Sequence, residues 1–116
     1  MKDTLRIFII CSYALSSSLF AEKMQEVSNK KNLPIKVKFF SPEKLKENLD
    51  NCDVVMLSPQ VRFNKAVFIE LLAPYKVPVV VIPMETYGLA DAEKAIELAI
   101  KSYEEMQMEG GKDSQE

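Results

Sequence analysis

The sequence predicts an α/β fold: a three-layer domain with a four-stranded parallel sheet of order 2-1-3-4 and helices on both faces. Stretches with strand-like patterns alternate along the chain with stretches of helical periodicity, which is typical of a covered parallel sheet. Three strand-like runs are continuously apolar and one alternates, and right-handed crossovers then favour this strand order. The chain of 116 residues suits one compact domain.

The first half of the chain predicts two strands and two helices. Residues 5–10 form an apolar run typical of a buried strand, and residues 17–30 have helical spacing. Residues 35–39 alternate with period two, which suits an edge strand with one wetted face. Ser41 and Pro42 indicate the start of a short helix, since they offer a capping hydroxyl and a proline in the first turn. The side chains expected to face inward from these helices are Leu19, Phe20, Met24, Val27, Leu45 and Leu49.

The second half repeats this alternation. Residues 53–57 and 77–82 are apolar runs that predict interior strands, and residues 61–72 between them predict a helix. Asp91 is expected to cap the last helix. The inward-facing residues of these two helices are expected to be Val67, Phe68, Leu71, Leu72, Ala92, Ala95, Ile96, Ala99, Ile100 and Tyr103.

Both ends of the chain need interpretation. Lys2 and Arg6 flank the first apolar run, as in a secretory signal, but Asp3 and the shortness of the run favour a buried strand. We therefore expect a cytoplasmic protein whose cysteines stay reduced. The end of the chain has little to bury, so we predict one domain over residues 1–106 and a disordered tail over 107–116.

Composition excludes several classes of function. Fifteen Lys and Arg against seventeen Asp and Glu give a net charge of −2, which disfavours nucleic-acid binding, and no apolar run is long enough to span a membrane. With no His and only two Cys, a tetrahedral zinc site and a Ser-His-Asp triad are excluded, and we expect neither a metal nor a cofactor. Two of the three glycines are Gly110 and Gly111, which excludes a Rossmann fingerprint and a Walker A loop.

Cys11 lies where a doubly wound sheet binds ligands, at the carboxyl end of the first strand, where the winding direction reverses. A helix follows it, and free amides at a helix start favour a thiolate and can hold a phosphate dianion. We expect a bare thiolate ringed by main-chain N–H groups, which suits a covalent phosphoryl intermediate. The alternative is a buried structural cysteine followed by a serine N-cap. The predicted phosphate-binding loop is Ser12, Tyr13, Ala14, Leu15, Ser16, Ser17 and Ser18.

Other residues are expected near the same edge of the sheet. Arg62 either reaches an anion there or stays solvated, and Gly88 is expected to mark a turn with positive φ. Cys52 has no serine loop or helix after it, so a structural role is expected. The rim residues expected to contact partners are Tyr13, Leu15, Pro59, Gln60, Arg62, Phe63 and Tyr87.

These segments resemble the B component (enzyme IIB) of the lactose/cellobiose type of the bacterial phosphoenolpyruvate-dependent sugar phosphotransferase system. The resemblance covers about residues 4–104. It rests on residues 9–11 with the serine-rich loop through Leu19, on residues 21–24, 53–61 and 79–82, and on Tyr87 with Gly88.

The resemblance implies a phosphocysteine at Cys11. A phosphohistidine of the A component would donate the phosphoryl group, and a sugar bound by the membrane C component would accept it. The family usually has glycine where this chain has Ala14 and Ser58, and often aspartate where it has Pro83. A residue other than glycine at positive φ costs about 1–2 kcal/mol, so Ala14 either strains the loop or changes its turn.

Two other functions stay open. The loop substitutions are compatible with a catalytically degenerate binding or regulatory module of the same fold. The second alternative is an enzyme similar to the low-molecular-weight phosphatases or the arsenate reductases. Such phosphatases need an arginine six positions after their cysteine and an acid for the leaving group, but Ser17 stands at that position here. We therefore predict transfer rather than hydrolysis.

Overall fold

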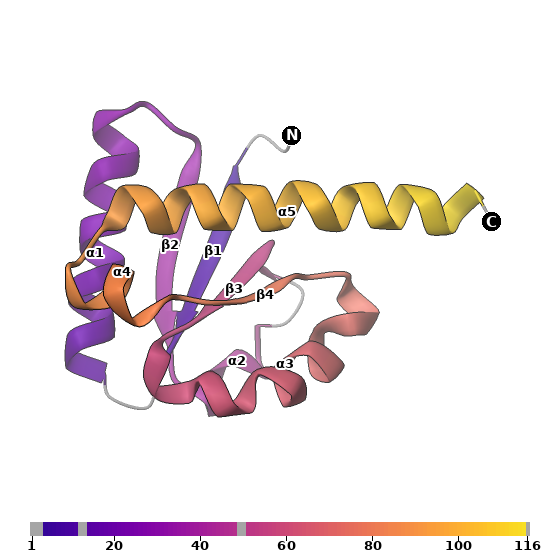
Figure 1. The fold of residues 1–116 in the computed structure, drawn as a ribbon, viewed down its shortest axis with the longest axis horizontal. Coiled ribbons are helices and arrows are strands. Elements are labelled where there is room, and N and C mark those ends of the chain that lie inside the picture. Colours follow the sequence, from indigo (N-terminus) through magenta and orange to yellow (C-terminus); the bar gives the residue numbers. More distant parts are fainter. Residues whose placement is uncertain (1–3, 12–13, 49–50, 116) are drawn as a thin grey trace.

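The computed structural model describes the backbone of residues 4–11, 14–48 and 51–115, while the side chains of residues 14–18 and 109–115 lie outside the description. The strands form one parallel sheet of order β2-β1-β3-β4, as predicted (Figure 1). The strands are β1 (Leu5–Ile10), β2 (Ile35–Phe40), β3 (Val54–Leu57) and β4 (Val79–Val81). The helical segments are α1 (Ala14–Lys30), α2 (Pro42–Leu45), η2 (Pro59–Asn64), α3 (Lys65–Leu72), η3 (Ala73–Tyr75), α4 (Met84–Gly88) and α5 (Ala92–Gln115).

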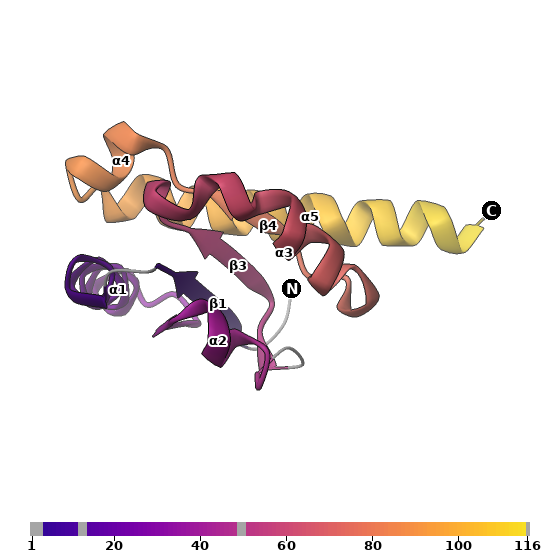
Figure 2. The same cartoon turned by 90° about the horizontal axis from the view of Figure 1, so that it is seen from below.

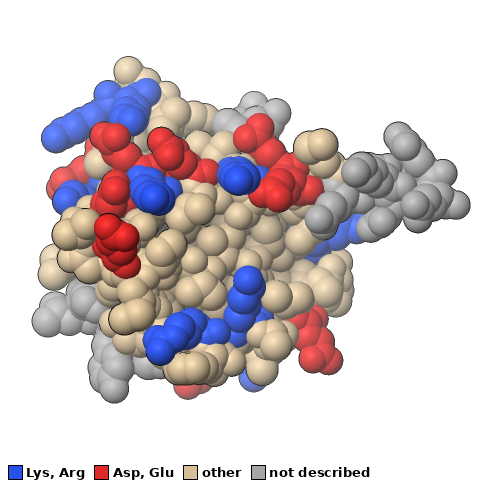
Figure 3. Space-filling model, in the orientation of Figure 1, with Lys and Arg blue, Asp and Glu red and all other residues tan. Residues whose placement is uncertain are grey.

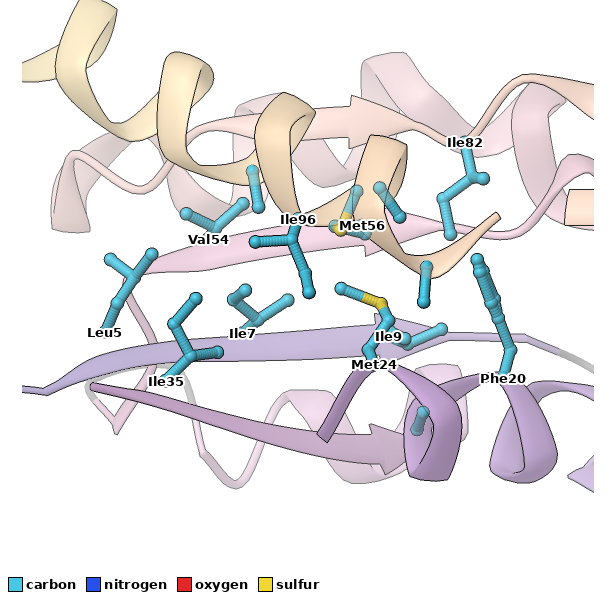
Figure 4. Close-up of a cluster of buried hydrophobic side chains, with 14 of the residues drawn as sticks. Leu5, Ile7, Ile9, Phe20, Met24, Ile35, Val54, Met56, Ile82 and Ile96 are labelled. Atoms are coloured by element: carbon cyan, nitrogen blue, oxygen red, sulfur yellow. The ribbon is translucent and has the colours of Figure 1, made fainter. Parts of the chain in front are cut away.

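Helices cover both faces of the sheet, which confirms the three-layer prediction. In Figure 1, α5 crosses the upper part of the strands, while α2 and α3 lie near their lower ends. The α1/α5 face has the larger core (Figure 4), made mainly of Leu5, Ile7, Ile9, Phe20, Met24, Ile35, Val54, Met56, Ile82, Ala95, Ile96 and Ala99. The core of the α2/α3 face contains Phe8, Ile10, Leu45, Cys52, Val55, Leu57, Val61, Phe68, Leu72 and Val77. Alternate residues of β1 and β3 therefore enter opposite cores.

The fourth strand differs from the prediction of an interior position. β4 is only three residues long, is half-buried and lies at the edge of the sheet beside β3. The apolar run at 77–82 is longer than the strand because Val77 and Ile82 at its ends are buried in the two different cores. A continuous apolar run reports burial, but it does not report how many neighbours a strand has.

The starts of two helices differ from those predicted. α1 begins at Ala14 rather than at residue 17, and α3 begins at Lys65 because the dihedral angles of Val61 (φ −111°, ψ 19°) break the helical path inside η2. Two residues assigned to the core are wrong, since Leu19 is 59% exposed and Val67 is 64% exposed. Leu49 lies outside the described residues.

Capping predictions have different outcomes at two helices. Asp91 accepts a hydrogen bond at Oδ1 from the backbone N–H of Lys94 (3.2 Å), so the predicted cap of α5 is confirmed. Ser41 stands at the N-cap of α2, but its hydroxyl makes no capping hydrogen bond.

Gly88 was expected at positive φ, and that is wrong: it ends the unpredicted helix α4, and the positive φ of 52° falls on Ala90.

α5 is longer than expected. It runs to Gln115 and extends beyond the other elements (Figure 1, Figure 2), whereas the sequence predicted a disordered tail from residue 107. Residues 104–109 are mostly Glu, Gln and Met, which favour helix, so the backbone continues past the last buried contact at Tyr103.

Candidate functional site

The central strands β1 and β3 end side by side, and their connections leave toward opposite faces. Ile10 pairs with Leu57, and the N–H of Ser58 donates to the carbonyl oxygen of Ile10 (3.1 Å). After β1 the chain enters α1 on the α1/α5 face, while after β3 it enters η2 and α3 on the other face. The winding direction therefore reverses between β1 and β3, as the sequence predicted, and Cys11 lies at this switch point.

The thiol of Cys11 is covered. The residue is 1% exposed, and its Sγ donates to Oε1 of Gln60 over 3.7 Å. The expectation of a bare thiolate is therefore wrong for this structure, because Gln60 reaches back from η2 to the end of β1. Gln60 is itself exposed, so the cover over the sulfur includes a side chain at the surface.

The predicted phosphate-binding loop is described only in part. Ser12 and Tyr13 lie outside the described residues. Ala14 opens α1 and so has helical dihedrals rather than the strained left-handed conformation considered for it. The expectation that a serine of this loop caps the helix is wrong for Ser16, Ser17 and Ser18, which all lie inside α1.

The start of α1 can still bind an anion. The first-turn amides, at Ala14, Leu15 and Ser16, have no partner within the helix, and the helix dipole adds partial positive charge there. The amide of Ser18 points to the carbonyl of the preceding turn in an α-helix, so its assignment as a main-chain donor to phosphate is wrong. The cradle is thus shorter than the sequence predicted.

Ser58 is a feature of this site that sequence reasoning noted only as a departure from the family pattern. It is 0% exposed, and its Oγ is a buried side-chain oxygen without a hydrogen-bond partner among the described residues. Its backbone is extended (φ −65°, ψ 158°) at the N-cap of η2, but its hydroxyl does not cap that segment. A polar residue that directly follows the fully buried strand 54–57 was the signal available in the sequence.

The remaining rim residues divide into exposed and packed ones. Arg62 is exposed, donates from Nη1 to the carbonyl oxygen of Pro59 (2.7 Å) and lies over the ring of Phe63 at 4.4 Å. These contacts belong to its own segment, which favours the solvated alternative over an anion clamp. Pro59 is buried, so its assignment to the exposed rim is wrong.

Tyr87 is half-buried rather than freely exposed. Its ring packs against Phe20 of α1 with centroids 5.1 Å apart, which ties α4 to the helix that follows Cys11. Pro83, where the family often has aspartate, is exposed at the N-cap of α4.

Other features of the described residues do not extend this site. Neither described cysteine is in a disulfide, no cluster of His, Cys, Asp or Glu there is able to hold a metal ion, and none of the described helices is long and apolar enough to cross a bilayer. A surface hollow near the amino end of β4 is lined by Lys65, Ile69, Ala73, Lys76, Val77, Pro78, Val79, Ser102, Glu105 and Met106. Acidic and basic side chains are intermixed over α5 (Figure 3), so this face has no continuous basic patch.

Comparison with known proteins identifies the family. Residues 6–98 match the family described as the lactose/cellobiose-specific IIB subunit of the PTS system. The chain is 33% identical over 95 residues to the oligo-beta-mannoside-specific EIIB component of Bacillus subtilis (strain 168), covering 82% of this chain and 92% of that protein.

Two solved structures are similar. The solution structure of the cellobiose-specific phosphotransferase IIB component from Borrelia burgdorferi has a TM-score of 0.74 and 29% identity, covering 89% of this chain and 94% of that chain. A lactose-specific IIB domain from Streptococcus pneumoniae has a TM-score of 0.71 and 21% identity, covering 86% and 98%, and supports the fold alone. The chain therefore belongs to the lactose/cellobiose-specific IIB family of the phosphotransferase system, in which its general role is phosphoryl transfer for sugar uptake.

Proposed function

We propose that this protein is a cytoplasmic phosphoryl carrier that holds the phosphoryl group on Cys11. A phosphohistidine of the A component donates the group, and a sugar bound by the membrane C component accepts it. The observation that carries this proposal is the place of Cys11, at the switch point and three residues before the start of α1 at Ala14. Membership of the IIB family supports the same role.

Both transfers are in-line displacements at phosphorus. The sulfur of Cys11 attacks, the S–P bond forms as the P–N bond breaks, and the leaving imidazole takes the bonding electrons and ends with the thiol proton. A sugar hydroxyl then attacks, the S–P bond breaks, and the hydroxyl proton passes to the sulfur or to solvent. The free amides at the start of α1 stabilise the charge on the equatorial oxygens in both steps.

The first transfer requires the sulfur to be uncovered. The side chain of Gln60 is exposed, and its hydrogen bond with Sγ is long, at 3.7 Å. A weak hydrogen bond with sulfur needs little free energy to break, and exposed side chains change rotamer in nanoseconds or less. Rotation of Gln60 is therefore part of the proposal, and docking of the donor would favour the open rotamer.

Exposed apolar side chains on the segments that follow β1, β3 and β4 are the proposed docking surface for both partners. Leu19 follows β1, Phe63 follows β3 and Met84 follows β4, and they are 59%, 80% and 68% exposed. The carboxyl ends of parallel strands meet at one edge of a sheet, so these side chains border the end where Cys11 lies. Large exposed apolar groups grouped in this way are typical of interaction surfaces.

The test is phosphorylation of the purified protein with phosphoenolpyruvate, the general phosphotransferase proteins and a cognate A component. We expect one acid- and iodine-sensitive thiophosphate on Cys11 in the wild type and in Cys52→Ala, and none in Cys11→Ser. Mapping of the phosphate to another residue, or its retention in Cys11→Ser, would contradict the proposal.

A non-enzymatic binding module is the second candidate, and the burial of Cys11 favours it. That function requires the wild type to bind the A component without receiving phosphate. Steady release of phosphate from p-nitrophenyl phosphate that is lost in Cys11→Ser would instead indicate a phosphatase.

A further inference from the structure

Ser58 is a buried polar group without an assigned role. Its residue exposure is 0%, and within the described part of the chain its Oγ has no hydrogen-bond partner. Another fully buried serine, Ser28, donates from Oγ to the carbonyl oxygen of Met24 at 2.8 Å. Buried hydroxyls are normally satisfied in this way, so an unsatisfied one requires an explanation, and a group that binds during function would supply the missing partner.

The register of the sheet places Ser58 beside Cys11. β1 and β3 are parallel with Ile9 opposite Met56 and Ile10 opposite Leu57, so the next pair in register is Cys11 and Ser58. The hydrogen bond from the N–H of Ser58 to the carbonyl oxygen of Ile10 belongs to the last pair of the ladder, Ile10 and Leu57, and holds Ser58 beside the end of β1. Neighbouring strands lie about 4.8 Å apart, which is within reach of a group bound to the sulfur.

The alternation of side chains places both residues on the face that α1 covers. Ile9 and Met56 enter the α1/α5 core, while Ile10 and Leu57 enter the other core. Ser58 keeps an extended backbone, so its side chain returns to the α1/α5 face, as does a continuation of β1 at Cys11. The hydroxyl is thus directed to the same side of the sheet as the sulfur and the first turn of α1.

On the basis of the proposed function, we propose that the Ser58 hydroxyl donates a hydrogen bond to an oxygen of the phosphoryl group on Cys11. The first-turn amides of α1 and this hydroxyl then hold the group from two sides. The serine remains protonated throughout, since it supplies a hydrogen bond and not a proton. Hydrogen bonds from hydroxyls to anionic oxygens are among the stronger ones in proteins.

The experiment measures the equilibrium and the rate of phosphoryl exchange between the A component and Cys11 in wild type, Ser58→Ala and Ser28→Ala. We expect Ser58→Ala to shift the equilibrium toward the A component by about tenfold or more, because it loses a hydrogen bond to a charged group. The matched control Ser28→Ala, near the far end of α1, should exchange as the wild type does.

Urea denaturation of the unphosphorylated proteins separates a functional role from a structural one. Ser58→Ala removes an unsatisfied buried hydroxyl, so its midpoint should be unchanged or higher, whereas Ser28→Ala removes a satisfied one and should have a lower midpoint.

Wild-type exchange in Ser58→Ala, or a loss of exchange accompanied by a lower midpoint, would overturn the role of Ser58 and leave the carrier function intact. A wild type that takes no phosphate on Cys11 would overturn both proposals, so the two failures are distinguishable.

Discussion

The two ends of the sheet differ in how their polar groups are satisfied. At the amino end, Asp53 accepts at Oδ2 from the backbone N–H of Arg6 (2.8 Å) and from its Nε (3.3 Å), while its own N–H donates to the carbonyl oxygen of Arg6 (2.8 Å). At the carboxyl end, the Ser58 hydroxyl is buried without a partner among the described residues, and the hydrogen bond from the Cys11 thiol to Gln60 is long, at 3.7 Å.

This difference shows how a small sheet separates stability from chemistry. The Asp53 carboxylate binds an N–H of β1 where β3 has not yet begun, so it extends the pairing of the central strands by a side chain. The other end keeps polar groups that a bound anion can use, and the helices begin there with free amides. Substitutions at the amino end should therefore change stability, and those at the carboxyl end should change transfer.

Asp53→Ala gives the largest expected effect at the amino end. The side chain is 7% exposed, and its loss leaves the N–H of Arg6 without its acceptor. Loss of such a buried, charge-assisted network costs about 2–3 kcal/mol. Urea denaturation at neutral pH should show this decrease in the free energy of unfolding, while the folded fraction still accepts phosphate on Cys11.

Glu47→Ala is the matched control, because it removes a carboxylate whose ion pair with Lys44 is long (3.9 Å) and exposed. Its effect should lie within about 0.5 kcal/mol. A strong loss of phosphoryl exchange in folded Asp53→Ala would mean that the two ends of the sheet are coupled. The amino end would then contribute to phosphoryl transfer as well as to stability.

The two ends of the sheet each have a cysteine, so the same residue type can be substituted at both ends and the effects compared. Cys52 precedes β3 at the amino end and is 5% exposed within the core of the α2/α3 face. Cys52→Ala leaves a small cavity, so it should lower the free energy of unfolding by about 1 kcal/mol. Its phosphate content should equal that of the wild type, and a lower content in fully folded protein would assign a role to the amino end.

The sequence predicted the sheet well because a strand buried on both faces has a continuous apolar run, while a strand buried on one face alternates apolar and polar residues. The continuous run of β1 and the alternation of β2 are examples. It did not predict α4, because a helix of five residues is too short for a period to be recognised. It misplaced β4 because an apolar run carries no information about sheet edges.

At the candidate site, the sequence placed Cys11 at the switch point but did not predict its cover. Gln60 is 49 residues away in the sequence, and the contact depends on how η2 turns after β3. The unsatisfied hydroxyl of Ser58 depends on the pairing of β1 with β3. Such relationships follow from three-dimensional register, which no local pattern encodes.

Gln60→Ala gives the smallest expected effect and tests the cover over Cys11 at the carboxyl end of the sheet. Removal of this side chain takes away part of the cover over Sγ and one hydrogen bond to it, a weak interaction that corresponds to about a two- to fivefold change in rate. In a Cys52→Ala background, iodoacetamide should alkylate Cys11 faster by this factor. Gln107→Ala, at an exposed position on α5, should leave the rate unchanged. An unchanged rate in Gln60→Ala would show that Gln60 does not limit access, and that other residues must move before phosphate reaches the sulfur.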